Sequence, residues 1–220
     1  MHRQRPPTCA LVSGGVDSAL LLRRLLNARN TVVPVYVQCG LRWETAELHW
    51  LRRVLRCLQT QALRSLQLIE LPLHTVYRNH WSLTGRRVPQ ARSRDAAVYL
   101  PGRNVLLISA AAIVSAERGI STIALGVLKG NPFGDATPRF FARLAGCLTQ
   151  ALNHPIRVLT PLRRFVKAQL IRSADAACLG STFSCLNPRG VTHCGRCNKC
   201  AERQRAFRAA GVPDPTAYAR

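Results

Sequence analysis

The chain has 220 residues and is 47% hydrophobic, enough to bury the core of one α/β domain with an appendage and too little for two large domains. Its 32 Lys and Arg outnumber its 10 Asp and Glu, which gives a net charge of +22. No apolar run approaches the roughly 18 residues of a membrane helix, and the apolar segment after the basic residues 1–7 is too short for a secretory signal. We therefore expect a soluble, cytoplasmic protein.

The positive charge consists almost entirely of arginine and admits two explanations. A large positive potential attracts polyanions, so the chain would bind nucleic acid or an acidic protein surface. Alternatively, the arginines cover solvated helix faces and reflect a compositional preference without a partner. Arginine occurs in almost every expected element, so the sequence leaves both explanations open.

The first expected strand, residues 8–12, runs into a loop with two glycines and then a leucine-rich helix over 17–27. The loop reads Ser13-Gly14-Gly15-Val16-Asp17-Ser18. Two adjacent glycines remove the Cβ atoms that would keep a phosphate from the backbone, and free N–H groups at a helix start attract anions. The loop resembles the PP-loop of the N-type ATP pyrophosphatases. We therefore predict that these six residues bind ATP, with an ordinary glycine turn as the alternative.

Four further strands alternate with helices along the chain. We expect the strands at 31–37, 66–71, 122–126 and 157–160. We expect helices from Glu44 onward and over 104–118, 141–152 and 166–177. Strand 31–37 alternates weakly, as is typical of a parallel strand covered on both faces. The sequence thus predicts an α/β fold, a doubly wound five-stranded parallel sheet with its ligand at the carboxyl ends of the strands.

The pattern lapses between residues 72 and 102, which is long for a loop in a compact domain. The segment combines aromatic residues with arginines, among them Arg86, Arg87, Arg92 and Arg94. Such a composition is suited to stacking on bases and neutralising phosphates, but it also fits a disordered, solvated loop, which is the interpretation we favour. We expect the segment to lie at the mouth of the ligand site, because it comes just before residues 101–104.

Four of the nine cysteines, Cys185, Cys194, Cys197 and Cys200, fall within sixteen positions. Two consecutive Cys-x-x-Cys steps are a strong metal signal, and four thiolates saturate a structural Zn²⁺. An iron–sulfur cluster, His193 in place of one thiolate, and unliganded or disulfide-paired cysteines remain alternatives. The cysteines at 9, 39, 57, 147 and 178 are scattered, and we expect them to pack as small apolar residues. We divide the chain into a nucleotide-binding domain, 1–180, and a zinc-binding, helical C-terminal segment, 181–220.

The chain resembles the 7-cyano-7-deazaguanine synthase family of queuosine biosynthesis almost from end to end. Beyond the phosphate loop, the resemblance rests on Pro101-Gly102-Arg103-Asn104, on Asp135, Pro138 and Phe140, on Thr160-Pro161-Leu162, Lys167-Ala168 and Ser184-Cys185, and on Cys194-Gly195-Arg196-Cys197 with Cys200. It implies an ATP-dependent carbon–nitrogen ligase that is a homodimer and uses Mg²⁺ with ATP and structural zinc. In this family 7-carboxy-7-deazaguanine becomes an acyl-adenylate, and ammonia then converts it, via the amide, to the nitrile.

The resemblance also implies roles for individual residues. Asp17 would help to hold Mg²⁺, and Lys167 and Arg103 would act on phosphate or on the substrate carboxylate, with surface salt bridges as the alternative. Arg103, Asn104 and Asp135 would contact the substrate, although Asn104 also fits a helix N-cap. No Ser-His-Asp or Cys-His arrangement is visible, and adenylation requires none.

The chain departs from the family pattern at the substrate end. Residues 128–132 form a shorter loop without acidic residues, Gln38-Cys39-Gly40 replaces the usual Asp-Tyr-Gly, and Arg163 and Arg164 stand where an acidic residue is typical. Three alternatives follow. The first is a specialised relative, as in bacterial antiviral defence, that attaches a deazaguanine to protein or nucleic acid. The second is a non-catalytic basic binding module, and the third is a tRNA-thiolating enzyme with Cys39 as its reactive thiol.

Overall fold

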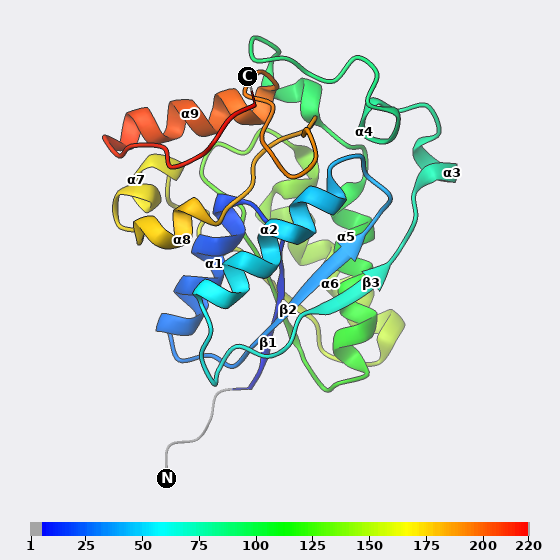
Figure 1. The fold of residues 1–220 in the computed structure, drawn as a ribbon. Helices are drawn as coiled ribbons and strands as arrows, with labels where there is room; N and C mark the ends of the chain where they lie inside the picture. Colours follow the sequence, from blue (N-terminus) through cyan, green and yellow to red (C-terminus); the bar gives the residue numbers. More distant parts are fainter. Residues whose placement is uncertain (1–5, 220) are drawn as a thin grey trace.

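The computed structural model describes residues 6–219 and is built around a five-stranded parallel sheet (Figure 1). The strands are β1 (Thr8–Leu11), β2 (Val32–Gln38), β3 (Gln67–Glu70), β4 (Thr122–Leu125) and β5 (Arg157–Leu159). They are hydrogen-bonded in the order β3-β2-β1-β4-β5, and every pairing is parallel. The predicted α/β fold with its five-stranded sheet is confirmed, and each strand lies within two residues of its expected bounds.

Helices cover both faces of the sheet. They are α1 (Val16–Asn27), α2 (Glu44–Cys57), α3 (His74–Tyr77), α4 (Trp81–Thr84), α5 (Arg103–Ala116), α6 (Pro138–Leu152), α7 (Lys167–Arg172), α8 (Ala176–Gly180) and α9 (Asn198–Ala210), with 3-10 turns at Asp95–Val98 and Gly134–Ala136. One buried cluster contains Ile108 of α5 and Phe141 of α6. The other contains Leu22 of α1, Ile171 of α7 and Phe207 of α9. Among the described residues, no helix is both long and apolar enough to cross a membrane.

The order of the strands fixes where a ligand binds. The chain moves from β1 outward to β2 and β3, and then returns to the other side of β1 to form β4. The connections therefore diverge between β1 and β4, and ligands of such sheets bind at the carboxyl ends of the strands at this point. The predicted phosphate loop follows β1 directly, so it lies at this position.

Two of the expected elements differ in the structure. Residues 166–177 do not form one helix. Val166 is the extended N-cap of α7, its N–H donating to the Gln169 side chain at 3.1 Å, and α7 ends before Ser173, whose hydroxyl donates to the Leu170 carbonyl at 3.1 Å. Nor is the segment from 72 to 102 merely a solvated loop. It contains the short helices α3 and α4, and it buries Val88 and Val98. The helices satisfy part of its backbone N–H and C=O groups, which need partners when a segment packs against the core.

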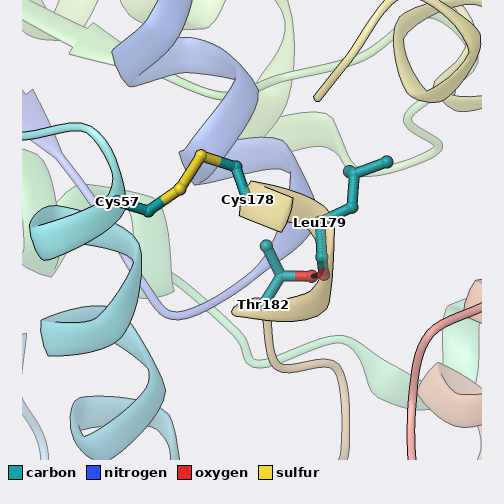
Figure 2. The surroundings of a disulfide bond; sticks show 4 residues. All are labelled: Cys57, Cys178, Leu179 and Thr182. Carbon is teal, nitrogen blue, oxygen red and sulfur yellow. Dashed lines mark hydrogen bonds between the residues drawn. A yellow bond between two sulfur atoms is a disulfide. The ribbon is translucent and has the colours of Figure 1, made fainter. Parts of the chain in front are cut away.

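The expectation that Cys57 and Cys178 are free packing residues is wrong. They form a disulfide that joins the last residue of α2 to α8 (Figure 2). The two cysteines are 121 positions apart, so nothing in their local sequence indicates the pairing. They meet because α2 and α8 pack together on the same side of the sheet as α1.

Candidate nucleotide site and four-cysteine centre

The phosphate loop is held in shape by its own serines. The Ser13 N–H donates to the Ser18 hydroxyl at 2.9 Å, and the Gly15 N–H donates to the Ser13 hydroxyl at 3.2 Å. Helix α1 starts at Val16 after an extended Gly15, and no side chain caps it. The N–H groups of its first turn are therefore available to an anion at the positive end of the helix dipole.

Glycine is required where the loop meets its neighbours. A Cβ on Gly14 would lie 2.6 Å from the Glu47 carbonyl oxygen of α2, and one on Gly126 would lie 3.0 Å from the Asp17 carbonyl oxygen. The Phe183 N–H, from the chain after α8, donates to the Gly14 carbonyl at 2.6 Å. The role of Gly126 was not predicted, although a glycine directly after a buried strand is a pattern that the sequence shows. The loop is thus enclosed by α2, the end of β4 and the C-terminal segment.

A cavity of about 300 Å³ opens beside the loop. Its lining includes Ser13, Asp17, Ser18, Tyr36, Glu47, Tyr99, Arg103, Asn104, Gly126, Asn131, Phe133 and Asp135. The structure therefore brings together most of the predicted nucleotide and substrate residues, and the loop over 127–137 lines this cavity as its position suggests. Lys167 is outside the lining and reaches the site through Asp17.

Asp17 is the acidic residue at the centre of the site. Its Oδ2 lies 3.2 Å from the Lys167 ammonium, which also bonds Glu202 of α9. Burial raises the pKa of Asp17, and Lys167 opposes that shift. Burial also disfavours a charged amine, but the carboxylates of Asp17 and Glu202 outweigh it and raise the pKa of Lys167, so the ammonium stays charged at neutral pH. The Asp17 Oδ1 is buried without a hydrogen-bond partner among the described residues.

The residues after Gly102 form the opposite wall. The Asn104 side chain donates to the Asp135 carbonyl at 2.9 Å, and the Asn104 N–H donates to Asp135 Oδ2 at 3.2 Å. Asn104 is not the N-cap of α5, because Gly102 occupies that position with a left-handed backbone. The Nε atom of Arg103 is buried and has no partner among the described residues. An unpaired guanidinium N–H in a cavity is suited to an anionic ligand.

Two buried glutamates at the start of α2 were not singled out in the sequence, where the leucines of this helix dominate the pattern. Glu44 accepts the N–H groups of Cys39 and Gly40 at 2.6 and 2.8 Å, which fixes the turn after β2. Glu47 accepts the Tyr36 hydroxyl at 2.9 Å and lines the cavity. Burial raises the pKa of Glu47, and the nearby Arg103 opposes this. Their signal is a pair of glutamates in the first turn of a helix that follows a core strand.

Cys39 is buried behind the site. Burial raises the pKa of its thiol to about 11, so the thiol is protonated at neutral pH. The reactive form of a cysteine is the thiolate. This environment gives no support to the expectation of Cys39 as a sulfur carrier.

The four clustered cysteines converge on one point. Their Sγ atoms all lie within 4.8 Å of one another, and the Cys185–Cys197 and Cys194–Cys200 sulfurs are 3.9 and 4.0 Å apart. A tetrahedral zinc site with Zn–S bonds of about 2.3 Å has S–S edges of about 3.8 Å. Backbone N–H groups of Leu186 and Cys194 donate to two of the sulfurs at 3.3 Å, which favours thiolates. The residues present fit a metal ion with four sulfur ligands.

The sheet order, the loop after β1 and the cavity define a PP-loop protein of the adenine nucleotide alpha hydrolase-like fold. Two solved structures share this fold. A 4-thiouridine synthetase in complex with RNA and ATP covers 94% of this chain and 50% of its own, with 17% identity and a TM-score of 0.54. A predicted tRNA methyltransferase subunit from Methanocaldococcus jannaschii covers 77% and 74%, with 16% identity and a TM-score of 0.50.

Sequence comparison gives the family. The protein-family model described as "Queuosine biosynthesis protein QueC" matches residues 8–211 of the chain. The chain is 33% identical to the 7-cyano-7-deazaguanine synthase of Anaeromyxobacter dehalogenans over 96% of its length and 94% of that protein. It is 30% identical to the synthase of Methanothrix thermoacetophila over 94% and 96%. The chain belongs to the QueC family of queuosine biosynthesis proteins, which confirms the resemblance found in the sequence.

Proposed function

We propose that this protein is a 7-cyano-7-deazaguanine synthase. It adenylates the carboxylate of 7-carboxy-7-deazaguanine with ATP, which releases pyrophosphate; ammonia then displaces AMP to give the amide, and loss of water from the amide gives the nitrile. The observation that carries the proposal is an uncapped helix start beside a cavity lined by Asp17 and Arg103, whose Oδ1 and Nε atoms are buried without a partner among the described residues. Membership of the family and the names of the relatives support 7-cyano-7-deazaguanine as the product.

The chain's own groups act where charge develops. The N–H groups in the first turn of α1, from Val16 onward, stabilise the departing pyrophosphate, since fixed dipoles aimed at a developing charge lower the barrier. The positive charge of Lys167, whose ammonium lies 3.2 Å from Asp17, adds to this stabilisation. Because Asp17 offers a free, buried oxygen, it fits as a ligand of Mg²⁺, which when bound would screen the phosphate charges.

The opposite wall recognises the acid. Arg103 lines the cavity and has a buried Nε–H without a partner among the described residues, which suits a carboxylate, and the hydrogen bonds between Asn104 and Asp135 fix the wall beside it. The adenylate is itself an electrophile, so ammonia attacks it without a covalent enzyme intermediate. The reaction therefore requires no nucleophilic side chain.

The four cysteines hold a structural zinc ion in this proposal. A four-thiolate shell is closed and leaves no position for water, so the ion stabilises the segment from 181 to 220 and takes no part in the chemistry. We retain the division at residue 180 and the family's homodimeric, cytoplasmic state as part of the proposal.

A second candidate is a specialised enzyme that transfers the activated deazaguanine to a macromolecule. It is favoured by the exposed arginines at 86, 87, 92 and 94, whose side chains form no hydrogen bond or ion pair within the described part of the chain. A basic scaffold without turnover remains the non-enzymatic candidate.

Calorimetric titration with Mg-ATP tests the proposal, with the Asp17→Ala variant in parallel. We expect the wild-type protein to bind ATP and the variant to lose both binding and function. A wild-type protein that binds no nucleotide would overturn the proposed synthase and the transfer enzyme together. Function that survives Asp17→Ala would identify a scaffold, and loss of activity in Cys39→Ser would restore a sulfur-transfer role.

A further inference from the structure

Helix α9, which begins after the third cysteine of the cluster, packs against α7 (Figure 1). From α9, Glu202 extends its carboxylate between two ammonium groups. Its Oε1 accepts from Lys167, the first residue of α7, and its Oε2 lies 2.5 Å from the Lys199 Nζ. Glu202 thus joins the C-terminal segment to the side chain that reaches Asp17.

The four charged groups form one compact network. Lys167 lies 3.2 Å from Asp17 Oδ2, and its side chain is only 18% exposed. Two carboxylates face two ammonium groups, so the network is neutral as a whole. An ammonium group has three N–H donors. In this arrangement Glu202 and Asp17 take two of them, and one remains for a phosphate oxygen.

We propose that Glu202 is a positioning residue for the nucleotide site, which fixes the Lys167 ammonium beside Asp17 and keeps one of its N–H groups directed at the phosphates of ATP. The inference rests on the proposed function, since it assumes that ATP occupies the cavity. Glu202 is absent from the cavity lining and acts only through Lys167. The C-terminal segment therefore completes the nucleotide site.

The physical reason lies in the flexibility of lysine. A lysine side chain has a flexible four-carbon stem, and a single ion-pair partner leaves its ammonium several orientations. A second anion on the far side fixes the nitrogen between the two carboxylates. Loss of the Glu202 charge also leaves Asp17 as the sole anion for Lys167, which draws the ammonium onto the carboxylate that is to bind the metal.

The Glu202→Gln variant tests this, because it keeps the shape of the side chain and removes its charge. We expect ATP binding to weaken, and the KM for ATP to rise, by roughly ten- to a hundredfold, as when an outer partner of a ligand-binding side chain is lost. The matched control is Glu117→Gln at the end of α5, an exposed carboxylate outside the network, which should bind ATP as the wild type does.

Two further measurements separate positioning from a structural role. Metal content and melting temperature should be nearly unchanged in Glu202→Gln, and in a Lys167→Met background the same change should leave ATP affinity as it is, because Glu202 acts through Lys167. If Glu202→Gln does not fold, Glu202→Asp takes its place, since it keeps the charge but withdraws it by one methylene from Lys167. Wild-type ATP affinity in Glu202→Gln or Glu202→Asp would overturn the inference alone. So would a loss of ATP affinity on changing Glu202 in the Lys167→Met background that equals the loss seen with Lys167 in place. A wild-type protein that binds no ATP would overturn it together with the proposed function.

Discussion

Gly14 shows how closely the phosphate loop is enclosed. A methyl group at this position would lie 2.6 Å from the Glu47 carbonyl oxygen, so α2 or the loop must move. We predict that Gly14→Ala abolishes ATP binding while the protein keeps its helical content, measured by calorimetry and circular dichroism. The control is Gly146→Ala in α6, where nothing lies within 4 Å of the new Cβ and stability should rise by about 0.5–1 kcal/mol. ATP binding by Gly14→Ala at wild-type affinity would contradict this geometry.

Which residues the sequence reveals depends on how local their signal is. The six residues of the loop are consecutive and the four cysteines fall within sixteen positions, so both patterns can be recognised in the sequence. In the structure Ser13, Asp17 and Ser18 line the cavity, and the four sulfurs converge. Gly126, Glu47 and Glu202 join the site from other elements through single contacts. One residue at one contact leaves no spacing to recognise, and only the tertiary structure reveals it.

The disulfide belongs to the scale of elements, because it ties α2 to α8 (Figure 2). Nine cysteines with two in a disulfide leave seven thiols. We predict that protein purified without reductant, then denatured with a chelator, titrates seven thiols per chain. The Cys57→Ser variant should titrate eight, because it releases Cys178. Nine thiols in the wild-type protein would show that the two cysteines stay reduced.

The same disulfide lies close to contacts that hold the C-terminal segment. The Thr182 hydroxyl donates to the Leu179 carbonyl at 2.6 Å (Figure 2). Both groups also accept from the buried Arg203 guanidinium. Arg203 is paired with Asp214 at 3.1 Å as well. The chain from α8 to its C-terminal residues is therefore attached to the core by polar contacts in addition to the four-cysteine centre.

Metal removal tests the role of that centre. We predict about one zinc per chain by elemental analysis, the capacity of one four-thiolate site. Cys197→Ser should lose the ion and about 3 kcal/mol of stability, or roughly 6–12 °C in melting temperature for a chain of this size. A variant that stays as stable as the wild type yet loses activity would contradict a structural role.

Element boundaries were predicted less well than element types. The sheet could be read from short apolar runs, since each parallel strand is buried by helices on both faces. The Gln169 side chain caps the start of α7 and the Ser173 hydroxyl lies at its end, and the apolar spacing of 166–177 reveals neither contact. Residues 72–102 form helices of four residues, too short to show a helical period.

At the scale of the molecule, many of the few acidic residues lie inside the fold. The acidic residues that are buried or engaged inside the fold include Asp17, Glu44, Glu47, Asp135, Glu202 and Asp214. Exposed arginines occur on helices around the molecule, and this spread leaves open whether the charge has a dedicated partner.

A salt series resolves that question. If residues 86–94 contact nucleic acid, the affinity for tRNA or duplex DNA should fall steeply with salt. For each phosphate contacted, a tenfold rise in salt concentration should lower the binding constant by roughly tenfold. Changing Arg86, Arg87, Arg92 and Arg94 together to Ala should flatten the slope. An unchanged slope, or no binding at physiological salt, would assign the charge to composition.

The synthase assignment itself is tested most directly by the reaction. Purified protein is incubated with 7-carboxy-7-deazaguanine, Mg-ATP and ¹⁵N-labelled ammonia, and pyrophosphate and the labelled product are followed by enzymatic assay and mass spectrometry. We predict acid-dependent release of pyrophosphate and AMP together with a nitrile that carries ¹⁵N, both absent in Asp17→Ala. A protein that binds ATP but releases no pyrophosphate with this acid and ammonia, and forms no labelled nitrile, would contradict it.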